Sequence, residues 1–189
     1  MIIIGIVGDI GSGKSYVAKQ FGYPVFNADN EVSKLYKKNK NIFTKLNKKL
    51  PKYIFTFPID KGELVNAILS NKKNLNIINN IVHREVRKKL NIFLKKNQNA
   101  KIVILDIPLL IENKIYKKKD VLIFIDSWKK DINKKIKKRP NYNIKLINIF
   151  RKIQFNLNYK KKKSHFIIKN TFTKTPVKKA IKKILNQIL

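Results

Sequence analysis

Apolar residues along the chain gather in short runs that are separated by longer stretches of mixed polarity. The runs at residues 2–7, 101–105 and 121–125 are rich in β-branched residues and do not alternate with polar ones, which is typical of strands buried on both faces. Shorter candidates are residues 23–26 and 166–168. Because helical stretches separate these runs, the pattern predicts an α/β fold in which helices flank a parallel sheet.

The stretches between these runs have helical periodicity. Residues 14–21 form one expected helix that stops at Gly22, and residues 177–189 form an amphipathic helix with apolar positions 177, 181, 184, 185 and 188. Residues 129–163 are expected to form two helices broken near Pro140. Residues 31–94 are mostly helical and polar. This insertion is not needed to cover the sheet, so it is a candidate substrate domain.

Length and composition limit the classes of protein to which this chain can belong. The 189 residues suit one compact domain with insertions, and the absence of cysteine excludes disulfides and cysteine-ligated metal sites. The first seven residues are apolar without a basic leader, so we expect a strand and not a signal peptide. No apolar run approaches the roughly 20 residues that cross a bilayer. These features predict a cytoplasmic protein without a membrane partner.

The net charge of +33 allows two interpretations. Such a charge attracts nucleic acids and anionic membranes. Against a dedicated nucleic-acid site, only four of the 44 basic residues are arginine, and Lys, Asn and Ile crowd nearly every segment. These three amino acids have A/T-rich codons, so codon bias alone can produce the charge. We therefore expect no specific nucleic-acid partner.

The stretch Gly8-Asp9-Ile10-Gly11-Ser12-Gly13-Lys14-Ser15 follows the first expected strand and matches the phosphate-binding pattern G-x-x-x-x-G-K-[ST]. Glycines let successive backbone N–H groups converge on phosphate oxygens. Lys14 is expected to reach the β- and γ-phosphates of ATP, and the Ser15 hydroxyl to bind Mg²⁺. Tyr16 completes the expected set of nucleotide contacts.

Nucleotide binding does not by itself specify a reaction. A GTPase normally carries an N-K-x-D motif, and none is present; a small kinase remains, which needs an acid near the acceptor hydroxyl and mobile cations over the phosphates. Asp29 follows the second expected strand, at the sheet edge where ligands bind in open α/β sheets. It is the candidate acid. The alternative is that Asp29 only caps the helix expected from Glu31.

Residues 5–15 together with Phe21-Gly22-Tyr23-Pro24-Val25-Phe26-Asn27-Ala28-Asp29 resemble the opening of the dephospho-CoA kinase family. In that family a Gly-x-Pro-x-x-Asp-Ala-Asp segment follows the loop at this distance. The resemblance implies that Asp29 is the base that takes the proton from the ribose 3′-hydroxyl. Asn27 replaces the first aspartate of the triplet, a departure that leaves the matched base intact.

Two further stretches are similar to the same family. Residues 81–87 resemble its Leu-x-His-Pro-x-[IV]-[RQ] segment, which implies that His83 and Arg87 bind phosphate groups of the substrate, although Arg84 replaces the usual proline. The alternative is that both are surface residues of a basic helix. Residues 103–112 resemble the strand that ends in Pro-Leu-Leu-x-Glu. This implies a Mg²⁺ role for Asp106 and a place near the substrate for Pro108 and Leu109. The alternative is that Pro108, Leu109 and Leu110 serve packing and loop shape.

Residues 129–163 contain 14 Lys or Arg against one acid, Asp131, where the chain average would give about eight. The family has its lid here. The resemblance implies that Arg139 closes over the phosphates, although Pro140 replaces the usual aspartate. Arg151 is one residue off the family's common arginine position and receives no role. Ile168-Lys169-Asn170 resembles the family's Ile-x-Asn near the adenine site, which makes Asn170 a further nucleotide contact.

The resemblance therefore implies a P-loop kinase with a core of residues 1–30, 96–128 and 164–189, a helical substrate subdomain of residues 31–95 and a basic lid of residues 129–163. ATP and Mg²⁺ are the expected cofactors, and dephospho-CoA the expected acceptor, with its 3′-hydroxyl near Asp29. We expect a monomer. The alternatives are another small P-loop kinase acting on a nucleotide or metabolite, and a basic nucleic-acid-binding protein that kept an ATP fold.

Overall fold

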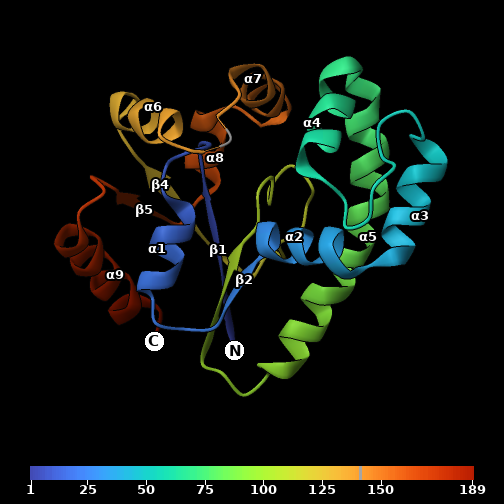
Figure 1. Ribbon diagram of the computed structural model, residues 1–189. Helices are drawn as coiled ribbons and strands as arrows, with labels where there is room; N and C mark the ends of the chain where they lie inside the picture. Colours follow the sequence, from blue (N-terminus) through green and yellow to red (C-terminus); the bar gives the residue numbers. More distant parts are fainter. Residues whose placement is uncertain (141) are drawn as a thin grey trace. The chain divides into compact units, whose positions relative to one another are not determined.

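The computed structural model describes residues 1–140 and 142–189. The strands of this chain are β1 (Ile2–Gly8), β2 (Val25–Asn27), β3 (Ile102–Asp106), β4 (Val121–Asp126) and β5 (Phe166–Lys169) (Figure 1). The helices are α1 (Lys14–Gln20), α2 (Ala28–Lys38), α3 (Lys40–Lys49), α4 (Lys61–Ser70), α5 (Lys72–Lys96), α6 (Lys129–Lys137), α7 (Ile144–Ile153), α8 (Leu157–Lys163) and α9 (Lys174–Ile188).

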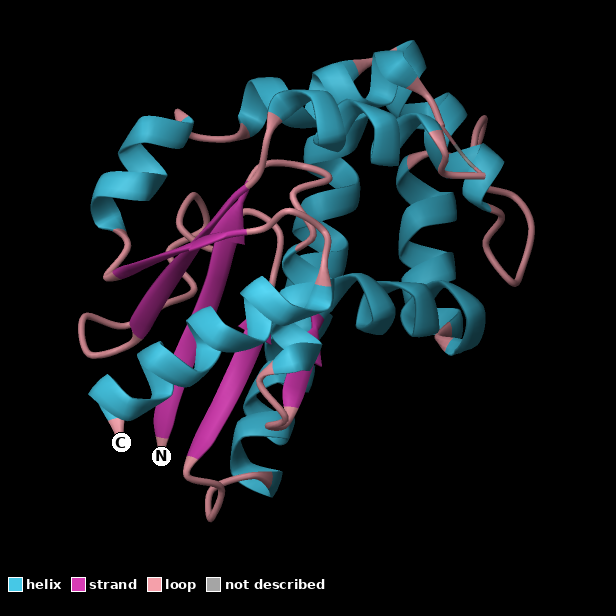
Figure 2. Cartoon of the chain, turned by 90° about the vertical axis from the view of Figure 1, so that its left-hand side faces the viewer, coloured by secondary structure: helices cyan, strands magenta, loops and turns pink. Residues whose placement is uncertain are grey.

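The strands form one sheet in the order β2-β3-β1-β4-β5, and every neighbouring pair is parallel. Figure 2 shows the strands side by side, with helices packed against them. The predicted α/β fold with a parallel sheet is confirmed. Because all strands run in one direction, Gly8, Asn27, Asp106, Asp126 and Lys169 end their strands at the same edge. This edge is where open parallel sheets bind ligands.

Contacts divide the chain into two compact units. The first contains Met1–Asn27, Asn97–Asn143 and Arg151–Leu189, and the second contains Ala28–Lys96 and Ile144–Phe150. The first unit holds the whole sheet. Capping side chains define helices of the second unit: the Asn39 side chain accepts a hydrogen bond from the N–H of Ile42, and Asp60 accepts from Gly62 and Glu63. A substrate role for residues 31–95 and a lid role for residues 129–163 stay predictions.

The described residues of the basic segment, 129–140 and 142–163, contain three helices, α6, α7 and α8, where the sequence pattern predicts two. The expected break near Pro140 is present, since α6 ends at Lys137. The missed break lies between Ile153 and Leu157, where the Asn156 side chain accepts a hydrogen bond from the N–H of Asn158 and starts α8. Asparagine is a favoured N-cap residue, but a single capping residue between Phe155 and Leu157, without glycine or proline, does not by itself separate two helices in the sequence pattern.

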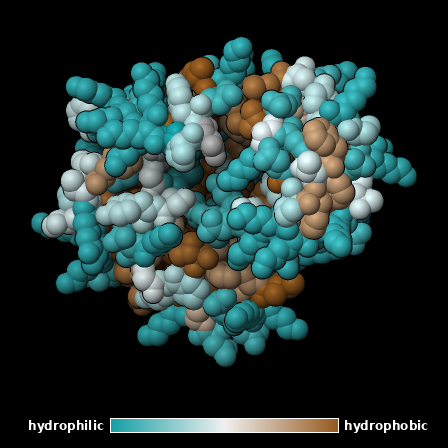
Figure 3. Space-filling model, in the orientation of Figure 1, coloured by the Kyte–Doolittle hydropathy of each residue, from teal (hydrophilic) through white to brown (hydrophobic). Residues whose placement is uncertain are grey.

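The surface carries most of the polar residues. The face in Figure 3 is mainly hydrophilic, with apolar atoms in small patches. Within residues 1–140 and 142–189, no helix combines the length and the apolar character that a membrane span requires.

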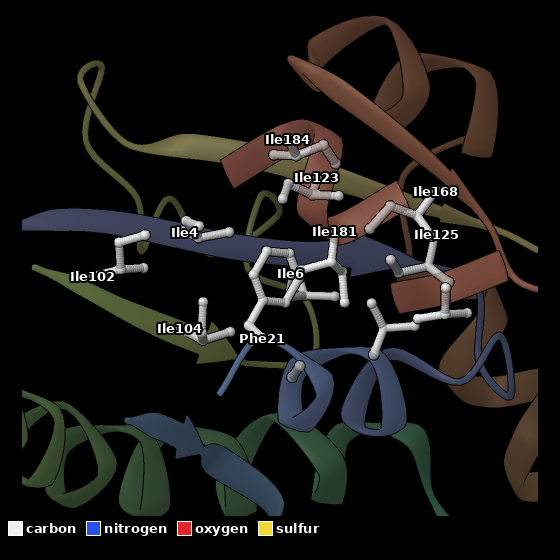
Figure 4. Close-up of a cluster of buried hydrophobic side chains, with 13 residues drawn as sticks. Ile4, Ile6, Phe21, Ile102, Ile104, Ile123, Ile125, Ile168, Ile181 and Ile184 are labelled. Carbon is white, nitrogen blue, oxygen red and sulfur yellow. The ribbon is translucent and has the colours of Figure 1, made fainter. Parts of the chain in front are cut away.

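The main core of the first unit lies between the sheet and the helices α1 and α9 (Figure 4). Each helix contributes residues spaced three or four apart, so one face of the helix is apolar. The α1 residues are Val17, Ala18 and Phe21 beyond its end, and the α9 residues are Val177, Ile181 and Ile184. They pack against strand isoleucines, each worth about 1.5–3 kcal/mol when fully buried. This packing fixes the strand ends at the site edge.

Candidate active site

The phosphate-binding pattern folds as a loop between β1 and α1. β1 ends at Gly8 and α1 begins at Lys14, so the strand, loop and helix lie as the sequence predicts. Gly11 and Gly13 have φ values of 84° and 85°, a conformation in which residues with a Cβ are strained. The backbone also turns on itself at the start of the loop, where the N–H of Ser12 donates to the carbonyl oxygen of Asp9 at 3.2 Å.

Lys14 places its ammonium group over this loop. Its Nζ donates to the carbonyl oxygen of Asp9 at 2.7 Å and to that of Gly8 at 3.3 Å. A cation at the centre of a loop rich in backbone N–H groups is the chemistry that a polyphosphate requires. The loop residues therefore fit the phosphates of ATP. The next residue, Ser15, is exposed at the start of α1, and Tyr16 is partly buried against the sheet core.

Asp106 and Asn27 meet at the carboxyl ends of neighbouring strands. They are register partners of β3 and β2, and the Asn27 side-chain amide donates a hydrogen bond to Asp106 Oδ2. Asp106 is only 3% exposed. Asn27 therefore orients a buried carboxylate, whereas an aspartate at position 27 would put two like charges together.

In residues 1–140 and 142–189, no group of three or more His, Cys, Asp and Glu side chains could hold a metal ion. Mg²⁺ in nucleotide sites usually takes one or two protein ligands and completes its shell with phosphate oxygens and water. Ser15 and Asp106 supply a hydroxyl and a carboxylate, which are ligands of that kind. The Mg²⁺ role of these two residues stays a prediction.

Asp29 is the second residue of α2, which begins directly after β2. The side chain is exposed and lies within the first turn of the helix. A capping residue flanks a helix and is not part of its first turn, so the structure does not support the cap interpretation with a helix starting at Glu31. A first-turn carboxylate still interacts favourably with the helix dipole.

His83 and Arg87 lie one turn apart on α5 in the second unit. Burial, and then the nearby Arg87 charge, lower the pKa of His83 from its usual value of 6.5. The imidazole is therefore mainly neutral at pH 7, and it can donate a hydrogen bond to a phosphate but brings no full charge. Arg87 is exposed, and its guanidinium has the paired N–H groups that bind phosphate.

A pocket of the second unit is lined by residues outside the recognised motifs. It has a volume of about 710 Å³ and contains none of the predicted site residues. Its lining includes four lysines against one glutamate: Lys34, Lys38, Lys40, Lys89 and Glu31. The motif residues, which have a defined chemistry, therefore remain the candidate site.

The two residues after β3 that are predicted to contact the substrate differ in burial. Pro108 is exposed and Leu109 is partly buried with a φ of 57°. The next residue, Leu110, is 1% exposed and lies over Gly5, where a Cβ would come within 2.5 Å of it. Packing and loop shape therefore account for Leu110, and the substrate role of Pro108 and Leu109 stays a prediction.

The arginines of the basic segment are placed differently from each other. Arg139 is exposed in the turn after α6, where its carbonyl oxygen accepts the N–H of Tyr142. Arg151, to which the sequence assigned no role, has its guanidinium 3.9 Å from the carboxylate of Asp9 in the phosphate loop. The sequence offered no signal for this pair, because the two residues are brought together only by folding.

A buried ion pair anchors α8. Lys160 Nζ lies 2.6 Å from Glu112 Oε1, and the two side chains are 3% and 8% exposed. Glu112 Oε1 also accepts the N–H of Phe155, just before α8 begins. Glu112 ends the Pro-Leu-Leu-x-Glu stretch and Lys160 lies in the basic segment of residues 129–163, and neither position indicated from sequence that the two would pair. The structure gives both a defined partner.

Asn170 follows β5 directly and is 1% exposed. Its side-chain amide donates to the carbonyl oxygen of Ser12 in the phosphate loop at 2.8 Å, and its Oδ1 accepts the N–H of Phe172 at 2.9 Å. Asn170 is thus joined to the phosphate loop, and its role as a nucleotide contact stays a prediction. Its contact in this structure is with the loop backbone.

Comparison with known proteins gives one consistent result. The sequence profile of the family described as dephospho-CoA kinase matches residues 2–175. A dephospho-CoA kinase of Wolbachia pipientis is 31% identical over 192 residues, covering 99% of this chain and 98% of the relative. One of Bartonella quintana is 32% identical over 173 residues, with 89% and 88% covered.

Solved structures agree in fold. A protein from Thermus thermophilus is 26% identical with a TM-score of 0.80, covering 100% of this chain and 98% of that one. A dephospho-CoA kinase from Campylobacter jejuni has a TM-score of 0.64 at 23% identity, with 98% and 96% covered. A shikimate kinase from Acinetobacter baumannii reaches 0.51 at 14% identity, with 100% and 93% covered, which reflects the shared fold alone.

Proposed function

The chain belongs to the dephospho-CoA kinase family, and from this premise we propose that it phosphorylates the ribose 3′-hydroxyl of dephospho-CoA with ATP. The products are coenzyme A and ADP, so the reaction is the last step of coenzyme A synthesis. The observation that carries the proposal is the strand–loop–helix at residues 2–20, with Lys14 over the loop, inside a family match of residues 2–175.

The phosphate loop binds the triphosphate of ATP in this proposal. Backbone N–H groups of residues 8–15 take the phosphate oxygens, and Lys14 exchanges its loop carbonyls for the β- and γ-phosphates. Ser15 and Asp106 are the candidate ligands of Mg²⁺, which supplies charge neutralisation on those phosphates when bound. Tyr16 and Asn170 are the further nucleotide-site residues.

The acceptor side uses Asp29, His83 and Arg87. The oxygen of the ribose 3′-hydroxyl attacks the γ-phosphorus, and Asp29 takes the proton of that hydroxyl. At the same time the bond from the γ-phosphorus to the β-γ bridging oxygen breaks. His83 and Arg87 bind phosphate groups of the acceptor, and Pro108 with Leu109 contacts it. Arg139 stabilises the charge on the transferred group, which makes it the third catalytic residue after Lys14 and Asp29.

We further propose that the enzyme works in the cytoplasm as a monomer, without a specific nucleic-acid partner. The support is the class of reaction, in which both substrates are small molecules, and the small share of arginine among its basic residues. Sedimentation of the purified chain tests the monomer, and a dimer that persists on dilution would overturn it.

A turnover assay with competing acceptors tests the function. ADP release is measured with ATP and dephospho-CoA, AMP, dTMP or shikimate as the acceptor. The proposal expects turnover with dephospho-CoA and a kcat/KM at least on the order of 100-fold lower for the other acceptors. Turnover that favours AMP, dTMP or shikimate would instead support a different small kinase.

A further inference from the structure

The carbonyl oxygen of Ser12 is held by two side chains from outside the phosphate loop. Ser127 Oγ donates to it at 2.9 Å, and Asn170 Nδ2 donates to it at 2.8 Å. A carbonyl oxygen has two lone pairs, so these two donors use its full accepting capacity. By contrast, the buried hydroxyl of Ser12 has no hydrogen-bond partner among the residues that the structure describes. The fold therefore directs donors at the backbone of this residue.

The two donors come from adjacent strand ends. Ser127 directly follows β4 and Asn170 directly follows β5, and these strands are neighbours in the sheet. The N–H of Asn170 also donates to the carbonyl oxygen of Asp126, the last residue of β4, at 2.7 Å. With Phe172 donating to its Oδ1, the Asn170 side chain is held at both of its polar atoms. Both donors are thus placed by the ends of adjacent strands, and Asn170 is held by further hydrogen bonds of its own.

Gly13 makes this contact possible. A Cβ at position 13 would lie 2.3 Å from Asn170 Nδ2, and the φ of Gly13 is 85°. Only glycine lets the Asn170 amide approach the loop this closely without displacing its backbone. The glycine before Lys14 therefore has a packing reason besides phosphate access.

We propose that Ser127 and Asn170 are positioning residues that orient the Ser12–Gly13 peptide for phosphate binding. In a trans peptide the C=O and the following N–H point in opposite directions. Holding the Ser12 carbonyl toward β4 and β5 therefore holds the Gly13 N–H toward the inside of the loop, where N–H groups converge on phosphate. The pair acts through this N–H and does not touch the reacting atoms. The inference rests on the proposed function for its kinetic readout.

The experiment compares Ser127→Ala, Asn170→Ala and the double variant with the parent enzyme, using Ser127→Thr as the conservative replacement that keeps the hydroxyl. Thr171→Ala is the matched control, because Thr171 is the exposed neighbour of Asn170 and bonds only with Thr173 among the hydrogen bonds of this loop. Calorimetry measures the affinity for ATP and for adenosine. Steady-state kinetics measures kcat and both KM values.

Each single variant is expected to lower the affinity for ATP about threefold to tenfold, as for the loss of one hydrogen bond. The double variant is expected to lower kcat/KM for ATP on the order of 100-fold. In Ser127→Ala, which leaves the adenine side of the site untouched, adenosine affinity and the KM for dephospho-CoA should stay within about twofold, and Ser127→Thr should recover the parent values. A general loss of structure would instead weaken all ligands and lower the melting temperature in step.

A double variant within about twofold of the parent in kcat/KM for ATP would overturn the proposal. If Asn170→Ala does not fold, Ser127→Ala decides the matter alone, since parent-like ATP affinity there means that the Ser127 hydroxyl orients nothing. Failure of the proposed function looks different. The parent enzyme would then bind ATP without phosphorylating dephospho-CoA, and the ATP affinities of the variants would still test the positioning role of Ser127 and Asn170.

Discussion

At the scale of single residues, Lys14 carries the strongest prediction. Lys14→Ala is expected to lower phosphoryl transfer by at least 10²–10³-fold, roughly the cost of removing one donor to a developing charge. The fold should survive, because the ammonium group bonds to carbonyl oxygens of the loop itself and Lys14 is not part of the hydrophobic core. Steady-state turnover and thermal unfolding measure both effects. Near-parent turnover in folded Lys14→Ala would remove the basis of the proposed ATP site.

Asp29 separates a catalytic from a structural role. Asp29→Asn is expected to lower kcat on the order of 10²-fold, in the lower half of the usual general-base range because the transition state of phosphoryl transfer is loose. The amide keeps the size but cannot accept a proton at neutral pH. If Asp29 served only the dipole of α2, the substitution would cost about 0.3–1 kcal/mol of stability and leave kcat unchanged. Kinetics with ATP and dephospho-CoA decides between them.

The lowered pKa of His83 predicts that the free energy of unfolding depends on pH. Its pKa is lowered in the folded chain, so below about pH 6.5 the unfolded chain takes up a proton that the folded chain resists. The contribution of His83 to stability is therefore complete above that pH and is lost as the pH falls through the folded pKa. Urea unfolding at about pH 5 and pH 7.5 should show a smaller difference in His83→Gln than in the parent.

Substitution of Arg87 tests whether its charge contributes to the lowered pKa of His83. Arg87→Gln removes the charge that disfavours the imidazolium, so the pKa of His83 followed by NMR should rise toward its usual value without reaching it, because burial remains. An unchanged pKa would mean that the side chains of His83 and Arg87 do not share a face of α5.

At the scale of elements, the pair of Glu112 and Lys160 joins the loop after β3 to α8. Lys160→Met is expected to cost about 3–5 kcal/mol of unfolding free energy, because it leaves the Glu112 carboxylate buried without its counter-ion. The double substitution of Lys160→Met with Glu112→Gln should recover part of this loss. Urea denaturation of the parent, both single variants and the double variant measures the coupling.

The same helix offers a matched control. Lys161 pairs with Asp126 at 2.9 Å, but the two side chains are 43% and 37% exposed. Lys161→Met should therefore cost no more than about 1 kcal/mol. Equal losses for Lys160→Met and Lys161→Met would show that the Lys160 pair is not desolvated in solution.

At the scale of the whole molecule, the net charge of +33 is expected to act as a diffuse field. Duplex DNA should bind weakly at low salt, and its affinity should fall on the order of 10³-fold or more between about 50 and 200 mM salt. Two unrelated duplexes should bind equally. Fluorescence anisotropy measures both points, and tight binding that depends on sequence at physiological salt would show a dedicated nucleic-acid site.

The amino-acid sequence by itself determined the features that depend on nearby residues. The buried runs that became β1, β3 and β4, the glycine loop before Lys14 and the apolar faces of α1 and α9 each arise from patterns within a few positions. The family resemblance, strongest over residues 1–29 and 101–112, could likewise be recognised from the sequence, and the family match confirms it. The extra helix break at Asn156 was missed because its local signal is one capping residue, with Phe155 and Leu157 on either side and no glycine or proline.

Only the tertiary structure decided which distant side chains meet. Ser127 and Asn170 reach the Ser12 carbonyl from 115 and 158 residues along the chain, and Arg151 reaches Asp9. No periodicity encodes such pairs, because a hydrogen bond needs two atoms within about 3 Å, and that closeness arises from strand order and packing. The sheet order β2-β3-β1-β4-β5 brings the ends of β1, β4 and β5 together, and with them the side chains that hold the phosphate loop in shape.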